Sequence, residues 1–148
     1  MRFILDSSTI VKLFLVEKNS TEVMDLMKIG YSKNVKFIAS ELVKYEVGNA
    51  FWKNLRKVED DGRKLIREFL MLDMNYIPLD EDLAIEVMKI AHENDITYYD
   101  GVHIALSKRF NVQLVTDDKT LLNKFNNVIT IKAALNQVED FNLISLEG

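Results

Sequence analysis

Short runs of β-forming residues alternate along the chain with longer amphipathic segments, and this alternation limits the possible folds more than any other feature. The runs typical of strands lie at residues 3–5, 36–39, 76–79, 112–115 and 128–131. The segments between them place apolar residues three and four positions apart, which predicts helices with one buried face. Residues 7–16, 21–31 and 98–110 are examples. Strands that alternate with helices favour a mainly parallel sheet covered on both faces.

A few residues mark where elements should begin and end. Ser40 stands where the N-cap of a helix belongs, and Asp80 can cap the helix that follows it. Pro78 is the sole proline, and because proline cannot donate to a β-ladder, it predicts an edge strand or a strand end. The pattern assigns no element beyond residue 133.

Composition narrows the class of protein. With 148 residues, 48% of them apolar, the chain suits one compact domain over residues 1–148. No apolar run approaches the roughly 20 residues that a membrane-spanning helix needs. The opening MRFILDSST reaches an aspartate too early for a signal peptide. The chain has no cysteine, which excludes disulfides, thiol nucleophiles and cysteine–zinc sites, so we expect a soluble cytoplasmic protein.

Charge is distributed unevenly along the chain. Its formal net charge is −4, but residues 28–67 hold ten Lys/Arg against five Asp/Glu. Six cations crowd the junction of two expected helices: Lys53, Arg56, Lys57, Arg63, Lys64 and Arg67. A basic ridge of this kind can hold a phosphate backbone. A solvated helical surface explains the same pattern equally well.

Aspartates follow two of the expected strands. Asp6 ends the first strand, and the pair Asp117 and Asp118 follows Val115. In a parallel sheet, ligands bind at the carboxyl ends of the strands, so these aspartates should share one rim of the sheet. Asp6 and Asp118 each also stand where a helix N-cap belongs, so capping is an alternative interpretation of both.

Two further acids lie on expected helices. Asp100 falls in the first turn of its helix, where the helix dipole favours an anion with or without a catalytic role. Glu46 shares the inward stripe of its helix with Val43 and Ala50. A buried carboxylate is usually paired or bound to a metal, so Glu46 predicts either an ion pair with a Lys or Arg or a metal site. His103, one turn after Asp100, is either a packed histidine or a residue of the same cleft.

Taken together, these acids predict chemistry on phosphodiesters. Hard divalent ions such as Mg²⁺ or Mn²⁺ prefer oxygen ligands. Such an ion can activate water and neutralise charge on the leaving oxygen. A serine mechanism fits less well, because Ser7 and Ser8 are not in a glycine elbow.

Three segments resemble the PIN-domain family, and more closely its VapC-type toxin ribonucleases: FILDSSTIVKLFL, SELVKYEVGNAFWK and TYYDGVHIALSKRFNVQLVTDDKTLL. The similarity covers nearly the whole chain, and the segments stand in the family's order. The resemblance implies that four acids bind the metal and carry catalysis, namely Asp6, Glu46, Asp100 and Asp118. It gives supporting roles to Ser8, Asn49 and Thr116, and it leaves open whether Asp117 or Asp118 is the fourth acid.

The same resemblance implies the fold and the partners. It implies a three-layer α/β/α fold around a parallel sheet of about five strands, Mg²⁺ or Mn²⁺ as cofactor, frequent homodimers and neutralisation by a cognate antitoxin. We therefore expect a metal-dependent endoribonuclease that hydrolyses RNA phosphodiesters as the toxin of such a pair. A non-catalytic module that binds RNA or protein is the main alternative. An aspartate-based phosphotransfer or receiver domain fits less well, because the adjacent pair at Asp117 and Asp118 comes late in the chain.

Overall fold

A single parallel sheet lies at the centre of the computed structural model, which describes residues 1–55 and 59–141. Its strands follow the order β3-β2-β1-β4-β5, and every neighbouring pair is parallel. The strands are β1 (Arg2–Leu5), β2 (Lys36–Ser40), β3 (Asn75–Ile77), β4 (Leu114–Val115) and β5 (Val128–Ile129). The expectation of a mainly parallel sheet of about five strands is confirmed.

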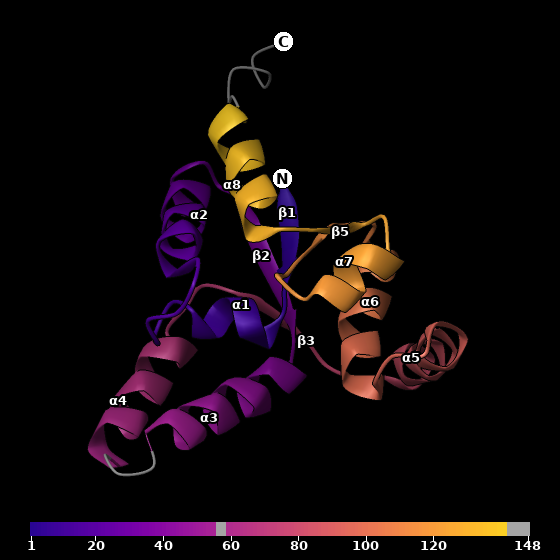
Figure 1. The fold of residues 1–148 in the computed structure, drawn as a ribbon, viewed down its shortest axis with the longest axis horizontal. Coiled ribbons are helices and arrows are strands. Elements are labelled where there is room, and N and C mark those ends of the chain that lie inside the picture. Colours follow the sequence, from indigo (N-terminus) through magenta and orange to yellow (C-terminus); the bar gives the residue numbers. More distant parts are fainter. Residues whose placement is uncertain (56–58, 142–148) are drawn as a thin grey trace.

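Helices cover both faces of this sheet, as Figure 1 shows. One face carries α1 (Ser7–Val11), α2 (Ser20–Ser32), α3 (Leu42–Asn54), α4 (Glu59–Leu70) and α8 (Ile131–Asp140). The other face carries α5 (Glu81–Asn94), α6 (Tyr98–Phe110) and α7 (Lys119–Lys124). The result is the expected three-layer α/β/α arrangement.

Two hydrophobic cores lie on opposite faces of the sheet, because successive side chains of a strand point to opposite sides. In β1, Phe3 and Leu5 join the core beneath α1, α2, α3 and α8, whereas Ile4 joins the core beneath α5 and α6. Strands buried on both faces appear in the sequence as unbroken apolar runs, which is the pattern of β1 and β2.

The sheet order places the candidate site. The chain moves from β1 outward to β2 and β3, and then returns to the other side of β1 for β4. Such a reversal leaves a crevice at the carboxyl ends of the strands. In the register of β1 with β4, Leu5 is opposite Val115, so the residues that follow each strand, Asp6 and Thr116, are neighbours.

Several local expectations are confirmed and others are corrected. Pro78 directly follows the edge strand β3, and the side chain of Asp80 caps α5 by accepting from Leu83 N. Glu41, rather than Ser40, occupies the N-cap position of α3, although Ser40 Oγ still accepts from Leu42 N at 3.1 Å.

Two corrections concern helix length. The helix expected over residues 7–16 ends as an α-helix at Val11 and continues only as turns. Residues 131–140, to which the pattern gave at most a strand end, form α8, whose N-cap Thr130 accepts from Ala133 N. No helix in the described part of the chain is both long and apolar enough to cross a membrane.

Candidate active site

Asp6 lies at the carboxyl end of β1 and is held by three donors. Its Oδ1 accepts from the backbone N of Thr9 and from Ser8 Oγ, both at 2.9 Å. Its Oδ2 accepts from Oγ1 of Thr116, which directly follows β4. Asp6 is therefore both the N-cap of α1 and a fixed, buried carboxylate between two strand ends.

Two threonines join the ends of β1 and β4. Thr116 is fully buried, and its hydroxyl oxygen also accepts from the backbone N of Asp118 at 3.1 Å. Thr9 Oγ1 donates to Val115 O at 3.1 Å. The position of Thr116 two residues before Asp118 thus has a direct physical reason, because one hydroxyl bridges the carboxylate of Asp6 and the backbone of Asp118.

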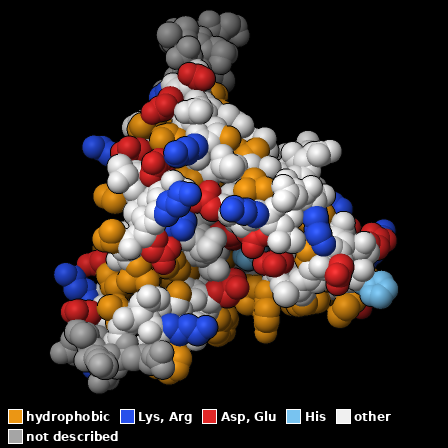
Figure 2. All heavy atoms as spheres, viewed as in Figure 1, with side chains coloured by type: hydrophobic (Ala, Val, Ile, Leu, Met, Phe, Trp, Pro, Cys, Tyr) orange, Lys and Arg blue, Asp and Glu red, His pale blue; other side chains and the backbone are white. Residues whose placement is uncertain are grey.

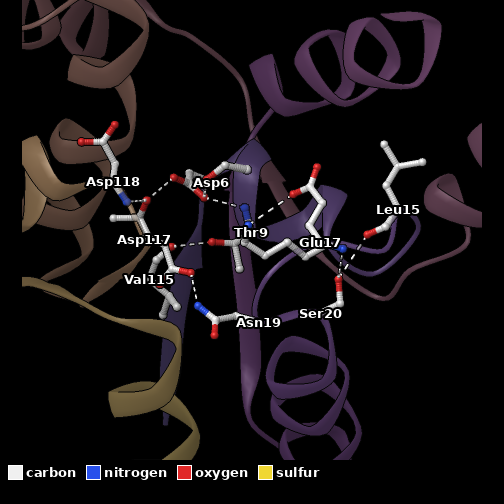
Figure 3. A network of polar contacts seen from close by, with 12 residues as sticks. Asp6, Thr9, Leu15, Glu17, Asn19, Ser20, Val115, Asp117 and Asp118 are labelled. Carbon is white, nitrogen blue, oxygen red and sulfur yellow. Dashed lines mark hydrogen bonds and ion pairs between the residues drawn. The ribbon is translucent and has the colours of Figure 1, made fainter. Parts of the chain in front are cut away.

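The adjacent aspartates after β4 point in different directions (Figure 3). Asp117 Oδ2 accepts from Asn19 Nδ2 at 2.6 Å, so its carboxylate is turned toward the segment before α2. Asp118 is exposed, and its Oδ1 caps α7 by accepting from Leu121 N at 2.9 Å. Sequence reasoning did not single out Asn19, and no local signal could have identified it, because its partner lies 98 residues away.

Asp100 faces this rim from α6. It lies in the first turn, where Thr97 Oγ1 caps the helix by accepting from Asp100 N at 3.1 Å. The pKa of Asp100 is raised above its ordinary value of 3.8, first by burial and then by the charges of Asp118 and Asp6, against the opposing effects of His103 and Thr97. The carboxylates of Asp118 and Asp6 are therefore close enough to act on that of Asp100.

Glu46 approaches from α3, and within the described residues it forms no ion pair with a Lys or Arg, which was one of the two alternatives predicted for it. Among the residues that the structure describes, its buried Oε1 has no hydrogen-bond partner, and it lies 3.5 Å from His103 Nε2. His103 is 3% exposed, and its Nδ1 likewise has no hydrogen-bond partner within residues 1–55 and 59–141. The histidine is thus both packed and turned toward the acids. A buried carboxylate oxygen without a donor is costly, and a cation would satisfy it.

The donor chemistry of this region fits a hard divalent ion, although the side chains do not enclose one as placed. In the described residues, no three acidic or histidine side chains are grouped tightly enough to hold a metal ion. All four acids nevertheless supply carboxylate oxygens, which Mg²⁺ and Mn²⁺ prefer. The unpartnered Oε1 of Glu46 and the raised pKa of Asp100 both indicate a region that lacks positive charge.

The remaining residues of interest lie farther along α3 and on α4. Asn49 is exposed one turn after Glu46. Lys53 is exposed in the last turn of α3, about 10 Å along the helix axis from Glu46. Arg63, Lys64 and Arg67 are exposed on α4, where Lys64 Nζ lies 3.8 Å from Glu68. Arg56 and Lys57 lie outside the described residues.

Sequence comparisons relate the chain to a known family. The family described as the PIN domain matches residues 3–126. Ribonuclease VapC3 of Pyrobaculum aerophilum is 26% identical over 137 residues, which cover 88% of this chain and 99% of that protein. Exonuclease VapC9 of the same organism is 29% identical over 100 residues, which cover 68% of this chain and 75% of that protein.

Solved structures extend the similarity to the fold. The structure of PAE2754 from Pyrobaculum aerophilum superposes with a TM-score of 0.75 at 22% identity, covering 95% of this chain and 91% of that one. A toxin–antitoxin complex from Klebsiella pneumoniae gives a TM-score of 0.65 at 15% identity, covering 86% and 96% of the two chains. At these identities the likeness concerns the fold alone.

Proposed function

Because the chain belongs to the PIN-domain family, we propose that it is a metal-dependent endoribonuclease and the toxin of a toxin–antitoxin pair. The observation that carries the proposal is that the charges of Asp118 and Asp6 act on Asp100 at the carboxyl edge of the sheet, while His103, on the same helix as Asp100, lies 3.5 Å from Glu46. The two relatives are named a ribonuclease and an exonuclease, and both names support a nuclease.

Each acid has a distinct part in the proposal. Asp6 and Asp100 are the main ligands of Mg²⁺ or Mn²⁺, and Glu46 and Asp118 complete the site. A bound divalent ion supplies an activated water and neutralises charge on the leaving oxygen. Ser8 and Thr116 keep the carboxylate of Asp6 in one orientation, since each donates a hydrogen bond to it.

The substrate is proposed to be single-stranded or looped RNA, because an unpaired backbone can bend into a cleft. The exposed cations Lys53, Arg63 and Lys64 form a basic ridge on the α3–α4 pair, and we propose that it holds the RNA backbone. Asn49 lies between the acids and this ridge along α3, where it can contact the same strand of RNA.

The proposal includes protein partners. The similarity to a toxin–antitoxin complex supports a cognate antitoxin as the regulator of this chain. A homodimer and a cytoplasmic location are parts of the same proposal. Co-purification with the product of a neighbouring reading frame tests the antitoxin. The mass of the protein in solution tests the dimer.

The strand order disfavours the alternative of a phosphotransfer or receiver domain. Receiver domains have a flavodoxin-like sheet of order 2-1-3-4-5, whereas this sheet has the order 3-2-1-4-5. A cleavage experiment distinguishes a nuclease from a non-catalytic module with the PIN fold, because such a module would bind RNA without cleaving it.

Cleavage of a labelled single-stranded RNA tests the proposed function. We expect cleavage at internal bonds with Mg²⁺ or Mn²⁺, and none with excess chelator. Asp6→Asn should lower kcat on the order of 100-fold or more, because it removes a charged ligand while preserving shape. Asp25→Asn, an exposed aspartate on α2, is the matched control and should cleave normally. Full activity of Asp6→Asn, or of the wild type in chelator, would overturn the metal mechanism.

A further inference from the structure

A pocket of about 250 Å³ opens where the start of α3 meets the start of α6. Tyrosine and aliphatic side chains dominate its lining: Leu42, Tyr45, Leu79, Tyr98, Tyr99 and Val102. Figure 2 shows hydrophobic side chains, among which tyrosine is counted, gathered between these two helix starts and directly beside acidic side chains. The pocket is therefore next to the candidate active site without being part of it.

The pocket and the acidic site use adjacent faces of the same two helices. Tyr45 directly precedes Glu46 on α3, and Tyr99 directly precedes Asp100 on α6. Because successive helical residues point about 100° apart, each helix can present a tyrosine to the pocket and a carboxylate to the site. The 3.5 Å approach of Glu46 Oε1 to His103 Nε2 joins the two helices along this boundary.

Two of the pocket's tyrosines, Tyr45 and Tyr99, are far more exposed than residues of the hydrophobic core. Tyr45 is 78% exposed and Tyr99 is 61% exposed, so their rings are open to a ligand. Glu41 also lines the pocket, and its carboxylate is paired with Lys44 at 3.1 Å. No Lys or Arg is among the described residues that line the pocket, which disfavours a phosphate there. A flat, uncharged ring system fits this chemistry, and nucleobases stack on tyrosine rings in this way. The pocket is smaller than the roughly 300–1,000 Å³ of drug-sized ligand sites, which suits a single base.

We propose that this pocket binds one nucleobase of single-stranded RNA, adjacent to the phosphodiester at the acidic site, with Tyr45 and Tyr99 as stacking residues. The inference rests on the proposed ribonuclease function and adds a base-binding subsite to it. The subsite positions the strand so that the neighbouring phosphodiester meets the carboxylates. Tyr45 and Tyr99 are thus positioning residues and take no part in the chemical step.

Cleavage kinetics of a short single-stranded oligoribonucleotide test the subsite. Tyr45→Ala and Tyr99→Ala should each raise KM on the order of 5- to 150-fold, the range that removal of one base–aromatic stack produces. Tyr45→Phe and Tyr99→Phe should keep the wild-type KM, because the ring remains. Met88→Ala is the matched control, since Met88 is also 61% exposed but lies on α5 outside the pocket.

A second substrate series identifies the ligand as a base. In this series one nucleotide at a time is replaced by an abasic ribonucleotide. One abasic position beside the cleaved bond should raise the wild-type KM as much as Tyr99→Ala does, and it should add nothing in that variant. Equal effects at every position, or unchanged KM in both alanine variants of an active enzyme, would overturn the subsite.

Two further outcomes are distinguishable. Sedimentation velocity shows whether the wild type is a dimer and whether the alanine variants are monomers. If they are, and if KM shows no rise that depends on the base, the tyrosines form a subunit interface and the inference is wrong. If the wild type cleaves no RNA with either metal, the proposed function fails and the subsite fails with it.

Discussion

Thr116 illustrates how a single hydroxyl organises the acidic rim. It donates to Asp6 Oδ2 and accepts from Asp118 N, and it is completely buried. Thr116→Val preserves the shape but leaves both partners without a hydrogen bond, which costs about 1–3 kcal/mol. We expect Tm to fall on the order of 5 °C and cleavage to fall with it. Thermal unfolding and cleavage assays check this, and Thr116→Ser, which restores the hydroxyl, should recover both.

Asp100 provides a prediction about pH. Its pKa is raised by burial and by Asp118 and Asp6, so ionisation of this group opposes folding. A carboxyl with a raised folded pKa contributes stability below its unfolded pKa of about 4 and loses it as pH rises through the folded pKa. We therefore expect Asp100→Asn in chelator to be more stable than the wild type at neutral pH, with a difference that shrinks toward about pH 4.

The competing effect at this position is the helix dipole. An ionised Asp100 in the first turn of α6 gains about 0.3–1 kcal/mol from that dipole, and asparagine loses this gain. Burial and the neighbouring acids raise the pKa of Asp100 in spite of His103 and Thr97, and we expect them to outweigh the dipole as well. Thermal unfolding of both proteins from about pH 4 to pH 7 measures the balance. If Asp100→Asn melts at a lower temperature than the wild type at neutral pH, the main role of Asp100 is to stabilise the start of α6.

Sequence patterns predicted the positions of the acidic residues better than they predicted which residues contact them. Asp6 and Asp118 could be placed on one rim because parallel strands end on the same side, and the structure brings Asp100 within electrostatic reach of both. Periodicity alone could not show that His103 would face Glu46, because their proximity depends on how α3 and α6 approach each other. Nor could it separate Asp117 from Asp118, whose directions depend on Asn19 and on the cap of α7.

At the scale of elements, the α3–α4 pair projects away from the sheet (Figure 1) and carries the basic ridge. Replacing Lys53, Arg63 and Lys64 with glutamine should weaken RNA binding across sequences and flatten its salt dependence, by about 0.7 in the log–log slope for each phosphate that the ridge no longer neutralises. Fluorescence anisotropy over a range of salt concentrations measures the slope. Glutamine at the exposed residues Lys36, Lys89 and Lys132 removes equal charge elsewhere and should change the slope less. Equal slopes in the two triple variants would mean that the ridge is an ordinary solvated surface and does not contact the RNA backbone.

Element boundaries were harder to predict than element types. The apolar run after Asp6 continues to Val16, so periodicity could not show that α1 ends at Val11, where the chain turns toward α2. The run at residues 128–131 is β-forming, yet Thr130 caps a helix there, and Ala134 and Val138 pack α8 against the core shared with α2. Tertiary packing overrides local propensity at both places.

At the scale of the whole molecule, the fold class followed from alternation, but the strand order did not. Nothing local to Leu114 shows that β4 pairs with β1 instead of extending the sheet beyond β3. That choice is what places Thr116 beside Asp6 in the candidate site. The expectation of a single domain over residues 1–148 stays a prediction, and cooperative unfolding in one transition is its test.

Metal binding should stabilise the whole molecule, because the carboxylates converge only in the folded chain. At a metal concentration about 100 times Kd, the gain is about 2.7 kcal/mol, which corresponds to a rise in Tm on the order of 5–10 °C for a chain of this size. The adjacent aspartates after β4 supply a matched pair of variants. Asp118→Asn should lose most of the gain, because the charge of Asp118 acts on Asp100, whereas Asp117→Asn should keep it, because Asp117 is turned toward Asn19. Thermal unfolding in a titration with Mg²⁺ or Mn²⁺ measures both, and the reverse result would make Asp117 the fourth acid.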